Sequence, residues 1–160
     1  MKSKKILIIG IGNDLRGDDS LGHTLVNNFN LKKFKKNNIL IEKLAVRYLD
    51  YDISEKLIEY DVVIFIDTAV NIKYPISIYK INLENFNINY LNKSSSHHLT
   101  IENLILYTKK LYYKLPEIFV IAIKGFNFEY TSKISKTAKY NLKLAKKALN
   151  KIINYIINKI

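Results

Sequence analysis

The chain has 160 residues, a length that fits one domain, and we expect residues 1–160 to form a single domain. It contains no cysteine, which excludes disulfide bridges, thiolate metal ligands and a cysteine nucleophile. Its formal net charge of +12 raises the question of nucleic-acid binding, but only two of the 26 basic residues, Arg16 and Arg47, are arginines. Because contacts to phosphates and base edges favour the arginine fork, we interpret the lysines as a solvated surface and expect no nucleic-acid partner.

Strand and helix patterns alternate along the chain. In chain order they predict a strand at 6–11, a helix at 21–29, a loop at 32–38, a strand at 39–46, a helix at 53–60, strands at 61–67 and 76–83, a loop at 85–96, a helix at 100–113, a strand at 117–124 and a helix at 134–159. Only residues 68–75 join the third and fourth strands, too few for a parallel crossover, so the fourth should run antiparallel. We therefore predict an α/β fold, a three-layer α/β/α domain with a five-stranded, mostly parallel twisted sheet.

The lengths of the apolar runs indicate whether any segment could span a membrane. None approaches the roughly 20 residues that a membrane-spanning helix needs. The basic residues 1–5 precede only a short apolar run, without a small-residue cleavage site. We expect a cytoplasmic protein with no membrane partner, and a monomer at this size.

A glycine-rich segment, residues 10–22, follows the first strand and reads GIGNDLRGDDSLG. The dinucleotide fingerprint G-x-G-x-x-G is not completed, because its third glycine position holds Leu15. Two aspartates then stand near the start of the next helix, where they would repel a phosphate. We expect no organic cofactor; a tight turn accounts for the first two glycines, and Asp18, Asp19 or Ser20 can serve as the helix N-cap.

Ligands of open α/β sheets bind at the carboxyl ends of the strands. Asp67 ends the third predicted strand, where a bare charge on a partly buried edge requires a cap role, a cation or a proton. His97 and His98 close the loop before the next helix, and one of the two should face inward; His23 is interpreted as a surface or packing residue. Carboxylates with one imidazole suit nickel or zinc, which favours metal-assisted hydrolysis.

These segments together resemble the hydrogenase maturation proteases. Residues 10–22 match the pattern G-I-G-N-x-L-x-G-D-D-x-x-G, which is similar to the N-terminal signature of that family. Residues 61–69 resemble its apolar strand ending in Asp-Ala, residues 95–99 its Ser-x-His segment, and residues 121–128 its last strand and following loop. The resemblance covers most of the chain, with the motifs in the family's order.

The resemblance implies an endopeptidase that removes the C-terminal extension from the large-subunit precursor of a nickel–iron hydrogenase. It implies that Asp19, Asp67 and His97 are the catalytic and metal-contacting residues, and that the nickel is supplied by the substrate. Some members of the family have glutamate at the position of Asp19, and the aspartate side chain is shorter than that glutamate. The resemblance also implies that three residues bind substrate: Asn13, Arg47 and Asp50.

The sequence departs from the family at residues 43–50. Many members carry a segment resembling D-x-G-x-R-G-x-D there, which is associated with substrate choice and cleavage. In this chain Arg47 and Asp50 remain, whereas Lys43, Ala45 and Tyr48 replace the aspartate and two glycines. A loop shifted by one residue would put His98 in place of His97.

Two alternatives to the endopeptidase stay open at this point. The altered segment is compatible with a non-catalytic chaperone that binds the precursor or nickel. The net charge of +12 is compatible with a basic nucleic-acid-binding module, whose affinity would fall steeply with salt.

Overall fold

The computed structural model describes residues 3–35, 38–83 and 99–159. Within them, one sheet contains the strands β1 (Lys4–Ile11), β2 (Ile39–Val46), β3 (Val62–Ala69), β4 (Ile76–Lys80) and β5 (Glu117–Lys124). Its order is β2-β1-β3-β5-β4, and every neighbouring pair is parallel except β4 and β5. The helices are α1 (Leu21–Asn28), α2 (Ile53–Leu57), α3 (Ile101–Tyr112) and α4 (Lys136–Asn158), with short 3-10 helices η1 (Gly17–Ser20) and η2 (Lys32–Phe34).

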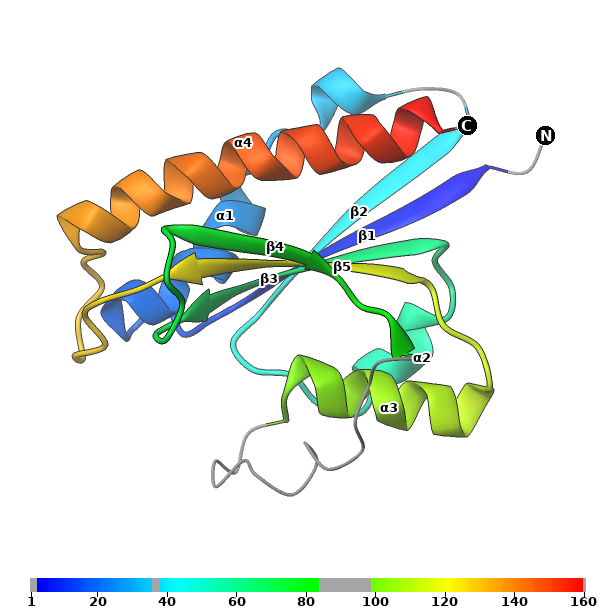
Figure 1. Cartoon of the computed structure of the whole chain (residues 1–160), viewed down its shortest axis with the longest axis horizontal. Coiled ribbons are helices and arrows are strands. Elements are labelled where there is room, and N and C mark those ends of the chain that lie inside the picture. The colour runs from blue at the N-terminus through cyan, green and yellow to red at the C-terminus, as the bar shows by residue number, and fades with distance from the viewer. Residues whose placement is uncertain (1–2, 36–37, 84–98, 160) are drawn as a thin grey trace.

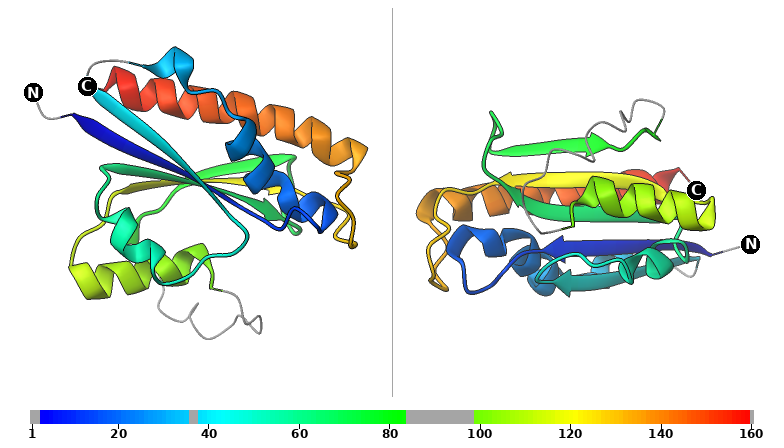
Figure 2. Two further views of the ribbon diagram at one scale, coloured as in Figure 1. Left: turned by 180° about the vertical axis from the view of Figure 1, so that it is seen from behind. Right: turned by 90° about the horizontal axis from the view of Figure 1, so that it is seen from below.

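The helices cover both faces of the sheet (Figures 1 and 2). Helices α1 and α4 pack on one face, and α2 and α3 pack on the other. This arrangement confirms the predicted three-layer α/β/α architecture and the single antiparallel strand.

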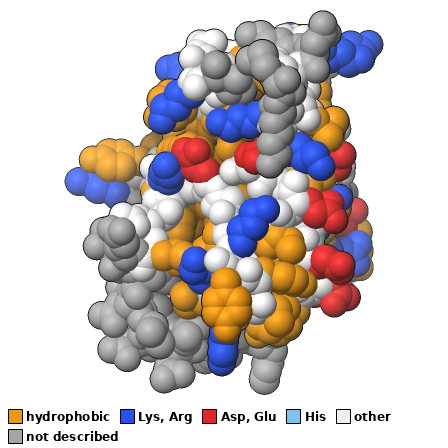
Figure 3. Space-filling model, turned by 90° about the vertical axis from the view of Figure 1, so that its right-hand side faces the viewer, with side chains coloured by type: hydrophobic (Ala, Val, Ile, Leu, Met, Phe, Trp, Pro, Cys, Tyr) orange, Lys and Arg blue, Asp and Glu red, His pale blue; other side chains and the backbone are white. Residues whose placement is uncertain are grey.

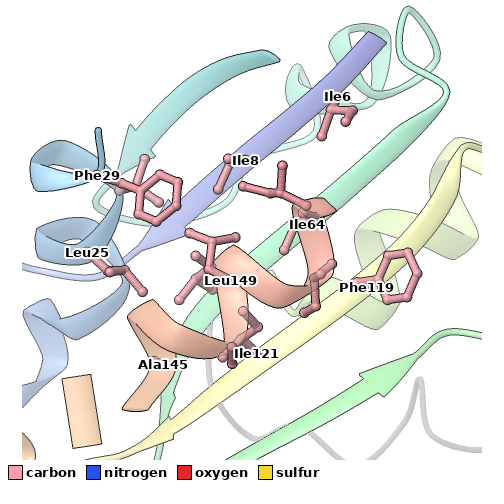
Figure 4. Packing of buried hydrophobic residues seen from close by; sticks show 14 of the residues in the cluster. Ile6, Ile8, Leu25, Phe29, Ile64, Phe119, Ile121, Ala145 and Leu149 are labelled. Carbon is pink, nitrogen blue, oxygen red and sulfur yellow. The ribbon is translucent and has the colours of Figure 1, made fainter. Parts of the chain in front are cut away.

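The three central strands are apolar on both faces because each face meets a helical layer. In β1, Ile6 and Ile8 join the core beneath α1 and α4, whereas Leu7 and Ile9 join the core beneath α2 and α3. Figure 4 shows the first of these cores, in which Leu149 of α4 reaches the strands. The same alternation places Asp67 on the α2–α3 side, two residues beyond Phe65.

Several predicted boundaries move. Strand β3 does not end at Asp67 but continues to Ala69, because Asp67–Ala69 pair with Ala122–Lys124 of β5. Helix α2 and strand β4 each end three residues early, at Leu57 and Lys80, and η2 occupies part of the predicted loop. The neighbour of β4 is β5 rather than β3, since β5 inserts between the two strands that follow each other in sequence.

The lysines of α4 lie on its outer face, as the helical pattern predicts. Exposed lysines occur at 136, 139, 143, 146, 147 and 151, while Ala145 and Leu149 are buried beneath them. On the face of the molecule that bears the amino ends of β1 and β2, basic side chains are scattered among acidic, polar and apolar ones (Figure 3). Among the described helices, none has the length and apolar character needed to cross a bilayer.

Candidate functional site

A pocket of about 640 Å³ opens at the carboxyl ends of the parallel strands. The segments that follow β1 and β2 contribute to it, as do the ends of β3 and β5, strand β4 and the start of α3. Its lining residues are Ile11, Gly12, Asn13, Arg16, Asp19, Arg47, Tyr48, Leu49, Asp67, Thr68, Ala69, Tyr79, Leu99, Thr100, Ile101, Glu102, Val120 and Ala122. The pocket therefore lies where open α/β sheets bind their ligands.

Asp19 reaches this pocket from η1, and the backbone around it is tightly held. Its Oδ2 accepts a hydrogen bond of 3.1 Å from the backbone N of Asn13, so the turn after β1 orients the carboxylate. The hydroxyl of Thr68 donates to the carbonyl oxygens of Asp18 and Asp19 at 2.9 and 3.3 Å. Gly12 has φ 149°, and a Cβ there would collide with the backbone oxygen of Asp19. Gly12 is therefore required because the backbone of Asp19 approaches it too closely to leave room for a side chain.

Asp67 is the most perturbed carboxyl group of the pocket. Burial raises its pKa from 3.8 to about 7, and the charges of Asp19 and Glu102 act in the same direction. A hydrogen bond of 2.7 Å from the backbone N of Thr68 to Oδ1 opposes this rise. Near neutral pH the pocket can therefore release or take up a proton at Asp67, and a bound cation would favour its ionised form.

Asp18 does not belong to the acidic lining, although it stands beside Asp19 in sequence. Its side chain is fully buried and accepts bonds from the backbone N of Phe126, Asn127 and Ser135 at 2.7–3.0 Å, and from Ser135 Oγ at 2.7 Å. Burial raises its pKa, but these hydrogen bonds outweigh that effect and hold the pKa below its usual range. Of the three N-cap candidates, Ser20 occupies the N-cap position of α1, but its side chain makes no cap hydrogen bond, because its hydroxyl donates to Gly17 O instead.

The three predicted substrate-binding residues are placed differently. Asn13 and Arg47 line the pocket, and Arg47 Nη2 lies 3.0 Å from Asp14 Oδ1. Asp50 is not among the lining residues; its Oδ1 accepts a bond of 3.2 Å from the backbone N of Ile53, at the start of α2. The structure thus brings two of the three to the pocket.

Lys43, which stands where the family pattern has aspartate, does not line the pocket either. Its ammonium group donates to the carbonyl oxygens of Asn27 and Phe29, at 3.2 and 2.9 Å, where α1 ends. A cation is favourable at a helix C-terminus, where carbonyl groups lack partners. This substitution therefore has a structural role at the end of α1, whereas Arg47, Tyr48 and Leu49 contribute to the pocket.

Replacing Lys43 by methionine is expected to lower the free energy of unfolding by about 0.5–1 kcal/mol, because two helix-terminal carbonyl oxygens lose their donor. Urea unfolding followed by circular dichroism measures the loss. Lys151→Met, a change on the exposed side of α4, is the matched control and should leave the unfolding curve in place. Equal curves for the two variants would show that Lys43 does not stabilise the end of α1.

The pocket contains functional groups that the sequence analysis missed. Glu102 lies in the first turn of α3, where Thr100 is the N-cap, and its charge acts on both Asp67 and Tyr79. Burial raises the pKa of Tyr79 to about 12, with Glu102 and Asp67 adding to the rise. An acidic residue two positions after a helix N-cap is the available signal for Glu102. Arg16 also lines the pocket, and no pattern in the sequence singled it out.

None of the three histidines is among the described lining residues of the pocket. His97 and His98 lie outside the described residues, whereas Leu99 and Thr100, which follow them, line the pocket. Nδ1 of His23 is 3.3 Å from the Asn27 amide on α1, outside the pocket lining. Within residues 3–35, 38–83 and 99–159, no three His, Cys, Asp or Glu side chains gather as a metal-binding group.

Comparison with solved structures identifies the fold. No protein-family model matches the sequence, and a search of curated proteins finds no match. The [NiFe] hydrogenase maturation protease HycI from Thermococcus kodakarensis superposes with a TM-score of 0.68 at 21% identity, over 94% of this chain and 93% of that one. The hydrogenase maturating endopeptidase HybD from E. coli superposes with a TM-score of 0.70 at 14% identity, over 94% of this chain and 93% of that one. This chain therefore has the fold of the hydrogenase maturation proteases.

Proposed function

We propose that this protein is an endopeptidase that removes the C-terminal extension of a nickel–iron hydrogenase large-subunit precursor. The observation that carries the proposal is the placement of Asp19 and Asp67 in one pocket at the strand ends, within the fold of the maturation proteases. The charge of Asp19 raises the pKa of Asp67, so the two carboxylates repel each other. A divalent cation between them would remove that repulsion.

In this proposal the cation is the nickel already inserted in the precursor. Asp19, Asp67 and His97 contact it, and Leu99, two residues after His97, lines the same pocket. Carboxylate and imidazole ligands are compatible with nickel. Docking on the metal would align the peptide bond to be cleaved, and a bound metal can polarise a carbonyl group. The protein would act in the cytoplasm as a monomer.

The test compares nickel-loaded and nickel-free large-subunit precursor from the same organism, each mixed with the purified protein. Intact-mass measurement should show shortening of the nickel-loaded precursor only. Asp19→Asn and His97→Ala should abolish the shortening, whereas Asp52→Asn, an exposed change outside the pocket lining, should preserve it. If His98→Ala rather than His97→Ala abolishes it, the histidine assignment moves by one residue.

The same mixture separates the proposal from its main alternative. A stable complex with the precursor that forms without any cleavage would favour a non-catalytic chaperone and would overturn the endopeptidase. Cleavage of both precursors at equal rates would preserve the endopeptidase and remove the role of nickel. The absence of both binding and cleavage with every hydrogenase precursor of the organism would reject both functions.

A further inference from the structure

Both arginines of this chain line the same pocket. The other 24 of the 26 basic residues are lysines, yet Arg16 and Arg47 occupy two of the pocket positions. A lysine provides a compact point charge, whereas the planar guanidinium offers a fork of donors that matches a carboxylate in two-point contact. The use of arginine at these positions, in a chain that otherwise uses lysine, indicates a demand for that fork.

The contact that Arg47 makes within the protein is easily exchanged. Its Nη2 is 3.0 Å from one oxygen of Asp14, and the two side chains are 52% and 53% exposed. The contact has one point rather than two. An exposed ion pair of this kind contributes little to stability, so another carboxylate can replace Asp14 at small cost.

Arg16 is held in place from one side only. Its Nε and one terminal nitrogen both donate to the carbonyl oxygen of Phe128, each at 3.3 Å, and the side chain is otherwise exposed. No described group bonds its other terminal nitrogen. The carbonyl therefore orients the guanidinium while leaving donors available for a ligand.

One short turn connects the two arginines with the acidic side of the pocket. The backbone N of Arg16 donates to Asn13 O at 3.1 Å, which closes a turn over residues 13–16. Asn13 donates its backbone N–H to Asp19, and Asp14 of this turn is the partner of Arg47. The lining of one pocket thus contains both the carboxylates of Asp19 and Asp67 and the two guanidinium groups.

We propose that Arg16 and Arg47 form a carboxylate-binding subsite for the peptide that occupies this pocket. A peptide carboxylate would be repelled by Asp19, Asp67 and Glu102, so the two guanidinium groups are the lining groups that accept it, and its binding to them fixes the direction of the peptide. The carboxylate comes from an Asp or Glu side chain or from the C-terminus. That the ligand is a peptide rests on the proposed function.

The test measures binding of dansyl-Ala-Ala-Asp-Ala to the intact protein by fluorescence anisotropy, in metal-free buffer. The same peptide as a C-terminal amide, and with asparagine in place of aspartate, removes one carboxylate at a time. We expect one of these two changes to weaken binding about tenfold, as the loss of a charge-assisted two-point contact would. The peptide that loses affinity identifies which carboxylate is bound.

The variants test the role of the guanidinium fork. Arg16→Lys and Arg47→Lys keep the charge and should each weaken binding of the free-acid peptide about five- to tenfold. Asp14→Asn removes the competing carboxylate and should strengthen binding severalfold. Lys133→Gln removes one exposed charge outside the pocket lining and is the control, which should bind as the unchanged protein does.

Equal affinity for all three peptides, no detectable binding, or equal loss in Lys133→Gln and the arginine variants would each overturn the subsite. Because this assay contains neither nickel nor precursor, its outcome is separate from the outcome of the cleavage test. Precursor cleavage that proceeds in a protein with no carboxylate preference would reject the subsite alone. Carboxylate-dependent binding without cleavage of any precursor would reject the endopeptidase alone.

Discussion

Replacing Asp18 by asparagine is expected to lower the free energy of unfolding by about 3 kcal/mol. The carboxylate is fully buried, and its two oxygens accept four hydrogen bonds from Phe126, Asn127 and Ser135. An asparagine side chain has the same shape, but its NH2 group must face at least one of these donors, whichever way the amide is turned. The variant therefore buries unpaired donors as well as losing charged acceptors.

Urea unfolding followed by circular dichroism measures this loss at pH 7. Asp14→Asn makes the same chemical change at an exposed position four residues earlier, and should shift the free energy by less than about 0.5 kcal/mol. Ser135→Ala removes one donor to Asp18 together with the N-cap bond to Ala138, so an intermediate loss of about 1–2 kcal/mol is expected. If Asp18→Asn were as stable as Asp14→Asn, the segment at residues 125–135 would not depend on this carboxylate.

The same carboxylate fixes an acid limit for the fold. Since the pKa of Asp18 is lower in the folded protein than the usual 3.8, its stabilising effect is fully present above that value. It is lost as the pH falls below 3.8 through the folded-state pKa. Asp18→Asn should therefore be less sensitive than the unchanged protein to acid below pH 4.

Asp67 is expected to act in the opposite direction and in a different pH range. Its folded-state pKa of about 7 lies above the usual 3.8, so between these values the unfolded chain releases a proton that the folded protein keeps. Stability therefore falls as the pH rises from about 4 to 7 and is constant above that. The shift corresponds to at most about 4 kcal/mol, and since water in the pocket reaches part of the side chain we expect a fall of about 2 kcal/mol.

Asp67→Asn should remove this fall, so that the variant is about 2 kcal/mol more stable than the unchanged protein at pH 8 and equal to it below pH 4. The amide oxygen can still accept the bond from Thr68 N. Unfolding is measured in metal-free buffer across pH 4–8. Asp52→Asn, an exposed aspartate that makes no side-chain cap, is the control and should follow the unchanged protein. If the free energy of unfolding of Asp67→Asn fell between pH 4 and 8 as much as that of the unchanged protein, the raised pKa of Asp67 would be contradicted.

The parts of the fold that could be predicted from sequence are those with local patterns. The continuous apolar runs predict β1, β3 and β5, which are buried on both faces of the sheet. The alternation of lysines with apolar residues predicts α4, which is buried on one face only. The insertion of β5 beside β3 could not be predicted, because strand order depends on pairing between residues far apart in the chain. The boundary of β3 shifted for the same reason, since Asp67–Ala69 extend the strand only through their partners in β5.

The residues of the candidate site likewise differ in whether a local sequence pattern indicates them. Asp19 and Asp67 could be proposed because strand ends of an α/β sheet meet at one edge. The sequence does not distinguish Asp18 from its neighbour Asp19, because the backbone donors that hold the Asp18 carboxylate come from residues 126–135, far away in the chain. Arg16 reaches the pocket through tertiary packing, which no local pattern reveals, whereas the helix-start pattern around Thr100 marks Glu102 without showing that it faces Asp67.

The strand order also determines when the sheet can be completed. Strand β4 leaves the ribosome well before β5, yet β5 is its partner in the described sheet and also the outer neighbour of β3. Until residues 117–124 have been synthesised, β3 lacks the partner of an edge whose first five residues are Val, Ile and Phe, and an apolar edge of this kind can pair with other chains. Because β5 pairs with both β3 and β4, these two strands lack their partner in the described sheet until residues 117–124 are available, which favours pairing with other chains during that interval.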